Sequence, residues 1–366
     1  MGIEKIFDEV IKTIPTINSS SDYWLVRSNS GEFFTDFNIN SYIGIAWNEI
    51  SLDDIKSANN DSEILKNTLR KKLKTDNGQE ISEQSYGSIA GQLLRFVNKI
   101  KVNDIVVVPS EHSESFIVGK VVGRPYEDTI NSIPKEKEPG DYHRSNYIKR
   151  IKVKWINRFN RSDADSALYK MIYTHNTLSD INDYKPFINR ALYRYYIEDD
   201  KFYISFKVTE TDDISSESLG QFIYQYSLLN RMLFPDNKLD VKTNVQSPGD
   251  IEFISHIVKD GLYLFGLISA GGIAFMGGKV SFMGQTFETP GIISGIQSYK
   301  TKKRSEQIAN DKEQLELIKE AARVSKELQV PISALGIEVP DKLENALESA
   351  VSSTPNDSHD DDNEHN

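Results

Sequence analysis

Two short, largely apolar runs set the strongest limit on what the first half of this chain can fold into. Residues 105–108 read Ile-Val-Val-Val and end at Pro109, and a second run follows at 115–123 after a polar turn. Runs of this length, rich in β-branched residues and bounded by turn residues, predict buried strands paired as a hairpin. Short strands that surround two helices favour a small β-barrel with helical insertions. The other strands are expected at 23–27, 42–47 and 147–155, and the helices at 51–74 and 84–100.

The composition is that of a folded protein with an acidic balance. Of the 366 residues, 38% are hydrophobic and 27% are charged, which is enough apolar material for the cores of two domains. The absence of cysteine excludes disulfides, thiolate metal sites and thiol catalysis. The net charge of −11 argues against a surface coated uniformly by nucleic acid. The histidines lack zinc-type spacing and no glycine-rich phosphate loop occurs, so we expect neither a metal nor a cofactor.

Six short motifs follow one another in a recognisable order along residues 21–200. They are Tyr-Trp-Leu-Val-Arg at 23–27, Ile-Gly-Ile-Ala-Trp at 43–47, Gly-Gln-Leu-Leu-Arg-Phe at 91–96, Val-Asn-Asp-Ile-Val-Val at 102–107, Val-Gly-Lys-Val at 118–121 and Val-Lys-Trp at 153–155. The series resembles the PUA/EVE-like domain at the front of bacterial Mrr-type restriction proteins. The resemblance implies a barrel, and related domains hold a flipped or modified base in an aromatic-lined pocket. It also implies nucleic-acid or nucleotide sensing in anti-phage defence.

Within such a barrel, two tryptophans are the candidates for a ligand pocket. Trp24 and Trp47 could bracket a planar ligand, and a place in the core is the alternative for each of them. Arg27 and Arg95 are nearby donors that could bind a phosphate or a base edge. His112, on the turn between the two apolar runs, is a further candidate contact, with a plain surface position as the alternative.

A basic segment lies in the last strand expected for this domain. Residues 142–162 contain seven Lys or Arg and no acid. Because side chains alternate along a strand, the cations at 150, 152 and 154 are predicted to share one face, roughly 7 Å apart. Such a row suits phosphates, and a solvated strand face is the alternative. The expected nucleic-acid contacts are Arg150, Lys152, Lys154 and Arg158, with Tyr147 and Phe159 as flanking rings for base stacking.

An Mrr-type restriction enzyme would also need a metal-dependent nuclease site, with two carboxylates and a lysine on adjoining strands. The nearest match is Asp236 followed by Asp240-Val241-Lys242, and only three residues separate the two aspartates. That spacing is too short for one strand to end and the next to begin. We therefore expect a protein that is not an enzyme. The alternatives are a nuclease subunit whose carboxylates assemble only in three dimensions, and a purely structural oligomer.

The second half predicts a strand–helix–strand module followed by a long apolar segment. The module resembles an accessory module of uncharacterised bacterial proteins, which indicates architecture only. Gly261 to Gly278 is 18 residues without a charge, just the length that a membrane span requires. A buried segment of a soluble protein is the alternative. Because its glycines allow close backbone approach, we expect a homo-oligomer in either case.

These patterns give an α+β protein with six segments. The hypothesis is a cytoplasmic bacterial defence protein whose front domain binds nucleic acid, a modified base or a nucleotide. Its rear half would form a homo-oligomer or insert in a membrane as the effector, in which case it would lie at the inner face of the cell membrane. The segments are an amphipathic helix at 1–20, a PUA/EVE-like sensing domain at 21–200, a strand–helix–strand module at 201–260, a Gly-rich hydrophobic segment at 261–298, charged helices at 299–351 and a disordered acidic tail at 352–366.

Overall fold

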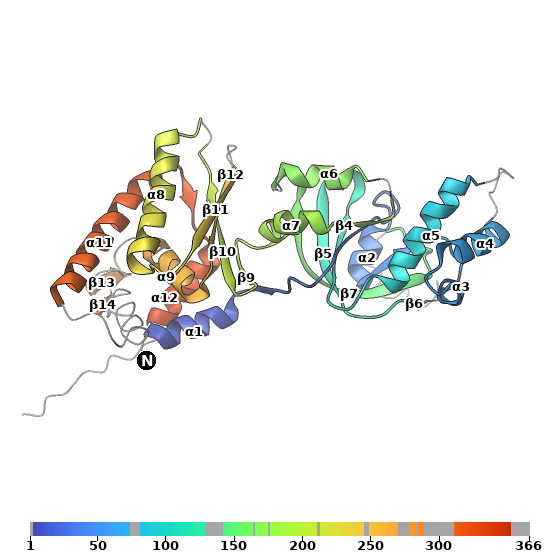
Figure 1. Cartoon of the computed structure of the whole chain (residues 1–366), viewed down its shortest axis with the longest axis horizontal. Helices are drawn as coiled ribbons and strands as arrows, with labels where there is room; N and C mark the ends of the chain where they lie inside the picture. The colour runs from blue at the N-terminus through green and yellow to red at the C-terminus, as the bar shows by residue number, and fades with distance from the viewer. Residues whose placement is uncertain are drawn as a thin grey trace, which may run out of the picture. The chain divides into compact units, whose positions relative to one another are not determined.

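The computed structural model of the chain consists of two compact units, each built around its own β-sheet (Figure 1). The N-terminal unit comprises Ser20–Leu192, and the composite unit comprises Met1–Ser19 together with Tyr193–Asn366. Both units combine strands with helices, so the expected α+β class is confirmed. The structure describes residues 3–73, 81–128, 142–163, 165–174, 176–210, 213–244, 249–269, 279–282, 285–288 and 311–352.

The sheet of the N-terminal unit is curled but open. Its strand order is β3-β7-β5-β4-β2-β8, with β6 beside β7, so among the described strands β3 and β8 are opposite ends of the sheet that do not pair. The sheet is thus a half-barrel, whereas the sequence predicted a small closed barrel. The predicted hairpin forms the centre of this sheet, because β4 and β5 pair antiparallel from Ile105↔Lys120 to Pro109↔Phe116. The strands are β2 (Tyr23–Val26), β3 (Tyr42–Ile45), β4 (Ile105–Pro109), β5 (Ser115–Val121), β6 (Tyr126–Glu127), β7 (Lys149–Asn160) and β8 (Leu178–Asp180).

A β-bulge interrupts the pairing of β5 with β7. Val118 lies opposite Asn157 whereas Gly119 lies opposite Trp155, so Ile156 is an extra residue on β7. A bulge reverses the alternation of side chains beyond it. Gly119 permits the close approach here, since a Cβ on it would lie 2.6 Å from the ring of Trp155.

Helices cover both faces of this sheet and bury two hydrophobic clusters (Figure 1). The larger cluster lies under α2 (Phe34–Asn40), α3 (Leu52–Ser57), α4 (Ser62–Lys72) and α5 (Glu83–Asn98). The smaller one lies under α6 (Tyr169–Ile172) and α7 (Lys185–Leu192). The helix predicted over residues 51–74 is two helices, because Asn59 and Asn60 adopt left-handed φ angles of 48° and 64° and Asp61 caps a new helix.

The composite unit buries one large core between its sheet and the helices that the structure describes. The sheet order is β1-β9-β10-β12-β11, with β15 paired to β10. The strands are β1 (Thr16–Ile17), β9 (Tyr195–Glu198), β10 (Lys201–Val208), β11 (Leu239–Asn244), β12 (Gly249–Ser255) and β15 (Ile337–Glu338), and a separate hairpin joins β13 (Lys279–Phe282) to β14 (Gln285–Glu288). The helices are α1 (Ile3–Thr13), α8 (Ser216–Leu233), α9 (Val258–Ser269), α11 (Asp311–Ala334) and α12 (Asp341–Ser352).

The N-terminal helix α1 is part of this core instead of a segment by itself. Phe7 stacks on Tyr263 of α9 with ring centroids 4.0 Å apart, and Val10 and Ile14 are buried beside it. The strand β1 that follows pairs with β9. Residues from both ends of the chain therefore build one hydrophobic core.

The described start of the long apolar run is the core helix α9. Its side chains from Leu262 to Phe265, with Leu267 and Ile268, are at most 3% exposed. Among the described residues, no helix is both long enough and apolar enough to cross a bilayer. The rest of the run, residues 270–278, and the acidic tail beyond Ser352 lie outside the described residues.

Candidate nucleic-acid interface

An open part of the sheet in the N-terminal unit carries three exposed lysines. Lys152 and Lys154 lie two residues apart on β7, and Lys120 of β5 lies directly opposite Lys154. Side chains opposite one another point to the same face, and like charges in such pairs destabilise a sheet. Helices α6 and α7 cover this face further along β5, where Phe116 and Val118 are buried. We call these three residues the lysine face.

The lysines of this face carry charges that no described carboxylate pairs with. Within the described ranges, neither Lys120, Lys152 nor Lys154 forms an ion pair with a carboxylate. The Lys152 ammonium lies 5.9 Å from the centroid of the Tyr126 ring, and that ring is half-buried. The arrangement is a compact cationic patch with one aromatic ring at its edge.

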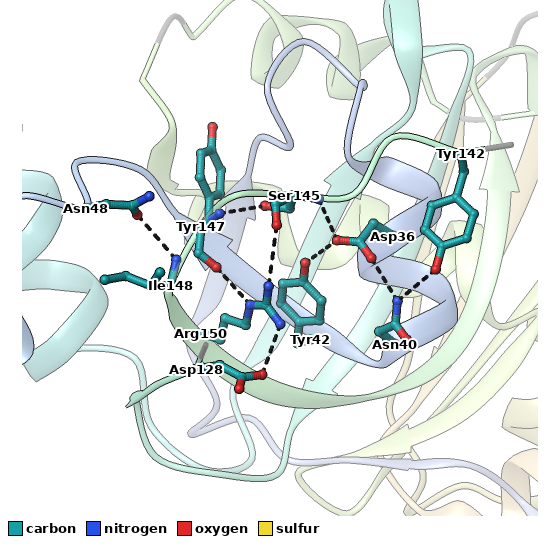
Figure 2. A network of polar contacts seen from close by, with 10 residues as sticks. All are labelled: Asp36, Asn40, Tyr42, Asn48, Asp128, Tyr142, Ser145, Tyr147, Ile148 and Arg150. Carbon is teal, nitrogen blue, oxygen red and sulfur yellow. Dashed lines mark hydrogen bonds and ion pairs between the residues drawn. The ribbon is translucent and has the colours of Figure 1, made fainter. Parts of the chain in front are cut away.

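Arg150, expected to extend this row, is buried instead. It is 3% exposed, and its guanidinium lies over the ring of Tyr42 at 4.2 Å (Figure 2). Its Nη1 pairs with Asp128 Oδ2 at 3.0 Å, and its Nε donates to the carbonyl of Tyr147 at 2.8 Å. The alternation that puts Arg150 on the face of Lys152 was right, but the segments around 128 and 145–147 fold over it. Arg150 therefore stabilises the sheet edge and cannot reach a phosphate.

The other half of this network ties a loop to the sheet. The Tyr42 hydroxyl and the backbone N–H of Ser145 both donate to Asp36 Oδ2, the latter at 2.9 Å (Figure 2). Burial, and then the hydrogen bond to Asp36, raise the pKa of Tyr42 well above its usual value. These groups satisfy one another inside the fold, so the network is structural.

The remaining residues predicted for nucleic acid are separated from the lysine face. Arg158 follows the bulge and points to the opposite side of the sheet, where its guanidinium lies 5.5 Å from the ring of Phe34. Tyr147 packs edge-on against Phe33 and is 8% exposed. Phe159 is buried in a stack on another ring. Neither aromatic ring is available for base stacking.

The two tryptophans have different surroundings. Trp24 is 4% exposed and its Nε1 donates to Asp104 Oδ2 at 3.0 Å, so it is a core residue. Trp47 is half-buried and has a left-handed φ of 62°, which is unusual for a bulky residue. Arg95 is half-buried on α5, with its guanidinium folded back towards Gly91. These three do not share a described pocket with one another.

A buried lysine that the sequence did not single out lies beside Trp47. The Lys149 side chain is fully buried, and its Nζ donates to the carbonyl of Trp47 at 2.7 Å. Burial lowers the pKa of Lys149 to about 8, against a smaller opposing effect of Glu127 and Glu49. In the sequence, Lys149 is one of several lysines on a basic strand, so no local signal separates it from its exposed neighbours.

Arg27 and His112, both predicted for ligand binding, do line one pocket. Its volume is about 240 Å³. The Arg27 guanidinium is half-buried at its edge and donates to the backbone carbonyls of Thr174, at 3.0 Å, and of Ile172. The lining residues are Arg27, Ser30, Gly31, Pro109, Ser110, Glu111, His112 and Ser113.

Asp240, one of the two aspartates weighed for a nuclease site, is held by other side chains. Asp240 of β11 accepts from His256 Nε2 at 2.8 Å and pairs with Lys238, and these two contacts lower its pKa. In the described part of the chain, no three His, Asp or Glu side chains group as metal ligands.

One comparison with known proteins gives a match. A family model described as Domain of unknown function (DUF8426) matches residues 23–182, a range that lies inside the N-terminal unit and contains the lysine face and the Arg27 pocket. No curated protein and no solved structure matches the chain significantly.

Proposed function

We propose that the N-terminal unit binds the phosphate backbone of nucleic acid on the lysine face. The supporting observation is that Lys120, Lys152 and Lys154 are exposed, lie on one face and have no acid partner among the described residues. In a sheet, the Cβ atoms of directly opposed residues, and those of residues two apart on one strand, lie roughly 5–7 Å apart. Such a cluster attracts a polyanion and releases its counterions on binding.

The charge of the chain favours the N-terminal unit over the composite unit as the place of binding. Residues 20–192 contain 24 Lys or Arg and 23 Asp or Glu, a net charge of +1, whereas the rest of the chain carries −12. The half-buried ring of Tyr126, beside Lys152, takes the place that Tyr147 and Phe159 had in the sequence-based prediction. A ring at the edge of a cationic groove suits stacking of a single-stranded base.

The wider setting of this proposal is bacterial defence, which the resemblance of residues 21–200 to the PUA/EVE-like front domain of Mrr-type proteins suggests. The composite unit would then assemble copies of the chain or engage a membrane. Leu262 to Phe265 are buried in the core of that unit, so these side chains are not available to a bilayer.

Binding of a labelled single-stranded oligonucleotide to the full-length chain, followed by fluorescence anisotropy, tests the proposal. Replacing the lysine face with glutamine, as Lys120→Gln, Lys152→Gln and Lys154→Gln together, should weaken binding about tenfold or more, uniformly across sequences. A matched control removes three exposed lysines from the helices on the other side of the sheet. It consists of Lys56→Gln, Lys71→Gln and Lys99→Gln.

The control should retain most of the wild-type affinity, since it removes the same charge away from the lysine face. Equal losses in the two triple variants would show only a general charge effect. That result, or a wild type that binds no oligonucleotide, would contradict the proposed function.

A further inference from the structure

Two turns that are far apart in the sequence meet at the pocket of Arg27. The first contains Gly31 and the second contains Glu111 and His112. A Cβ on Gly31 would lie 2.3 Å from the backbone nitrogen of Glu111, and the φ of Gly31 is 101°, so this position requires glycine. On the second turn, His112 and Ser113 have left-handed φ angles of 53° and 56°. Backbone of this kind is costly and occurs often at binding sites.

Arg27 brings to this pocket a positive charge that forms no ion pair with a described carboxylate. Its Nε and Nη2 are held by two backbone carbonyls, and its Nη1 makes no hydrogen bond to any described residue. Burial lowers the pKa of Arg27, and no carboxylate opposes that effect. A half-buried cation is stabilised when an anion accepts from it, and a guanidinium suits an oxyanion.

The pocket also offers two serine hydroxyl groups without a hydrogen-bond partner among the described residues. Ser113 is 6% exposed, and its Oγ forms no hydrogen bond in the part of the chain that the structure describes. The Ser30 side chain is exposed on the facing turn, and the His112 imidazole completes the lining. The one acid of the lining, Glu111, has a side chain that is 77% exposed, so water screens its charge.

We propose that this pocket binds a phosphate monoester, with Arg27 and Ser113 as donors to its oxygens. A phosphate group presents three strong acceptor oxygens, which matches a guanidinium combined with hydroxyls better than a carboxylate does. The volume of about 240 Å³ equals that of about eight water molecules. It holds a phosphate and a few attached atoms, and is smaller than the roughly 300–1,000 Å³ that encloses a whole larger ligand.

This site is separate from the lysine face and does not depend on it. The pocket includes Ser113, two residues before β5 begins, whereas Lys120 is close to the end of that strand. The five-residue step along β5 from Ser115 to Lys120 alone covers roughly 17 Å. Loss of one site should therefore leave the other intact.

Calorimetric titration of the full-length chain with inorganic phosphate, AMP and adenosine tests the phosphate site. Phosphate and AMP should bind saturably and adenosine should not. Arg27→Gln should weaken both by about tenfold or more, and Ser113→Ala by about three- to tenfold. Ser113→Ala keeps a Cβ and changes the backbone preference little. It therefore still tests the phosphate site if Arg27→Gln does not fold. Lys56→Gln, an exposed lysine on α3 that belongs to neither site, should leave phosphate binding unchanged.

The relative affinities of inorganic phosphate and AMP show which of these two sources of phosphate the pocket prefers. Equal affinities for phosphate and AMP mean that the free ion suffices, and tighter binding of AMP means that a mononucleotide is the better ligand. Absence of saturable binding up to about 10 mM phosphate or AMP would overturn the site. Equal binding by the wild type, Arg27→Gln and Ser113→Ala would also overturn it, even if oligonucleotides still bind the lysine face.

Discussion

Lys149 shows how a single buried charge affects the stability of the N-terminal unit. Its ammonium is shielded from water and has the Trp47 carbonyl as its hydrogen-bond acceptor. The pKa of Lys149 falls from 10.5 to about 8, mainly because burial penalises the charged form. At 1.36 kcal/mol per pKa unit, the charged form costs about 3 kcal/mol of folding free energy at neutral pH.

We predict that Lys149→Met stabilises the unit at pH 7 by about 1–3 kcal/mol. This is a net gain, because the substitution removes the cost of the buried charge and also the hydrogen bond to the Trp47 carbonyl. The unfolded chain keeps this proton up to about pH 10.5 and the folded chain releases it near pH 8. Wild-type stability should therefore rise with pH between about 8 and 10.5, and the gain from the substitution should shrink over that window. Urea denaturation at several pH values measures both. A gain that does not change with pH would contradict the role of Lys149.

Arg150 marks the limit of what strand alternation can predict at the residue scale. Alternation placed Arg150 correctly on the face of Lys152 and Lys154. It could not show that Tyr42, Asp128 and the carbonyls near 145–147 would enclose the guanidinium, because those partners come from other segments. Lys120 was missed for a related reason, since its place opposite Lys154 depends on the pairing register of two strands.

At the scale of elements, the bulge in β7 decides which cations belong to the lysine face. Ile156 is the extra residue, so Arg158 points away from Lys152 and Lys154. The central hairpin was predictable from its apolar runs. The bulge was not, because it depends on the ring of Trp155 filling the space that Gly119 leaves on the partner strand.

We therefore predict unequal effects of two single substitutions on β7. Lys154→Gln should weaken oligonucleotide binding and lower the magnitude of the salt slope by about 0.7 on a single strand. Arg158→Gln removes the same charge four residues away but on the other side of the sheet, so it should change the slope by much less. Anisotropy titrations at several salt concentrations compare the two. Equal reductions in slope would show that Arg158 also contacts phosphate.

At the scale of the whole molecule, the two units differ in how the chain builds them. The N-terminal unit is one continuous segment with its own buried clusters. The composite unit needs α1, whose Phe7 stacks on Tyr263. The periodicity of residues 1–14 predicted this helix but not its partner, because contacts across about 250 residues leave no local signal. The apolar run at 261–278 was ambiguous between a membrane span and a buried segment for the same reason.

We predict that a fragment of residues 20–192 folds by itself and binds oligonucleotides with the salt slope of the full-length chain. A fragment of residues 193–366 should lose stability, because the surface of α9 that Phe7 covers becomes exposed. Thermal unfolding and binding of each fragment check this. A fragment 20–192 without a cooperative transition would contradict the division into units.

The dependence of oligonucleotide affinity on salt concentration tests most directly whether the lysine face binds phosphates. For a single strand, each phosphate contact contributes about −0.7 to the slope of log K against log salt concentration. The wild-type slope should therefore be steeper than that of the triple glutamine variant of Lys120, Lys152 and Lys154 by about 2. The control variant of Lys56, Lys71 and Lys99 should keep the wild-type slope. Equal slopes for the wild type and the lysine-face variant would show that these lysines contact no phosphate.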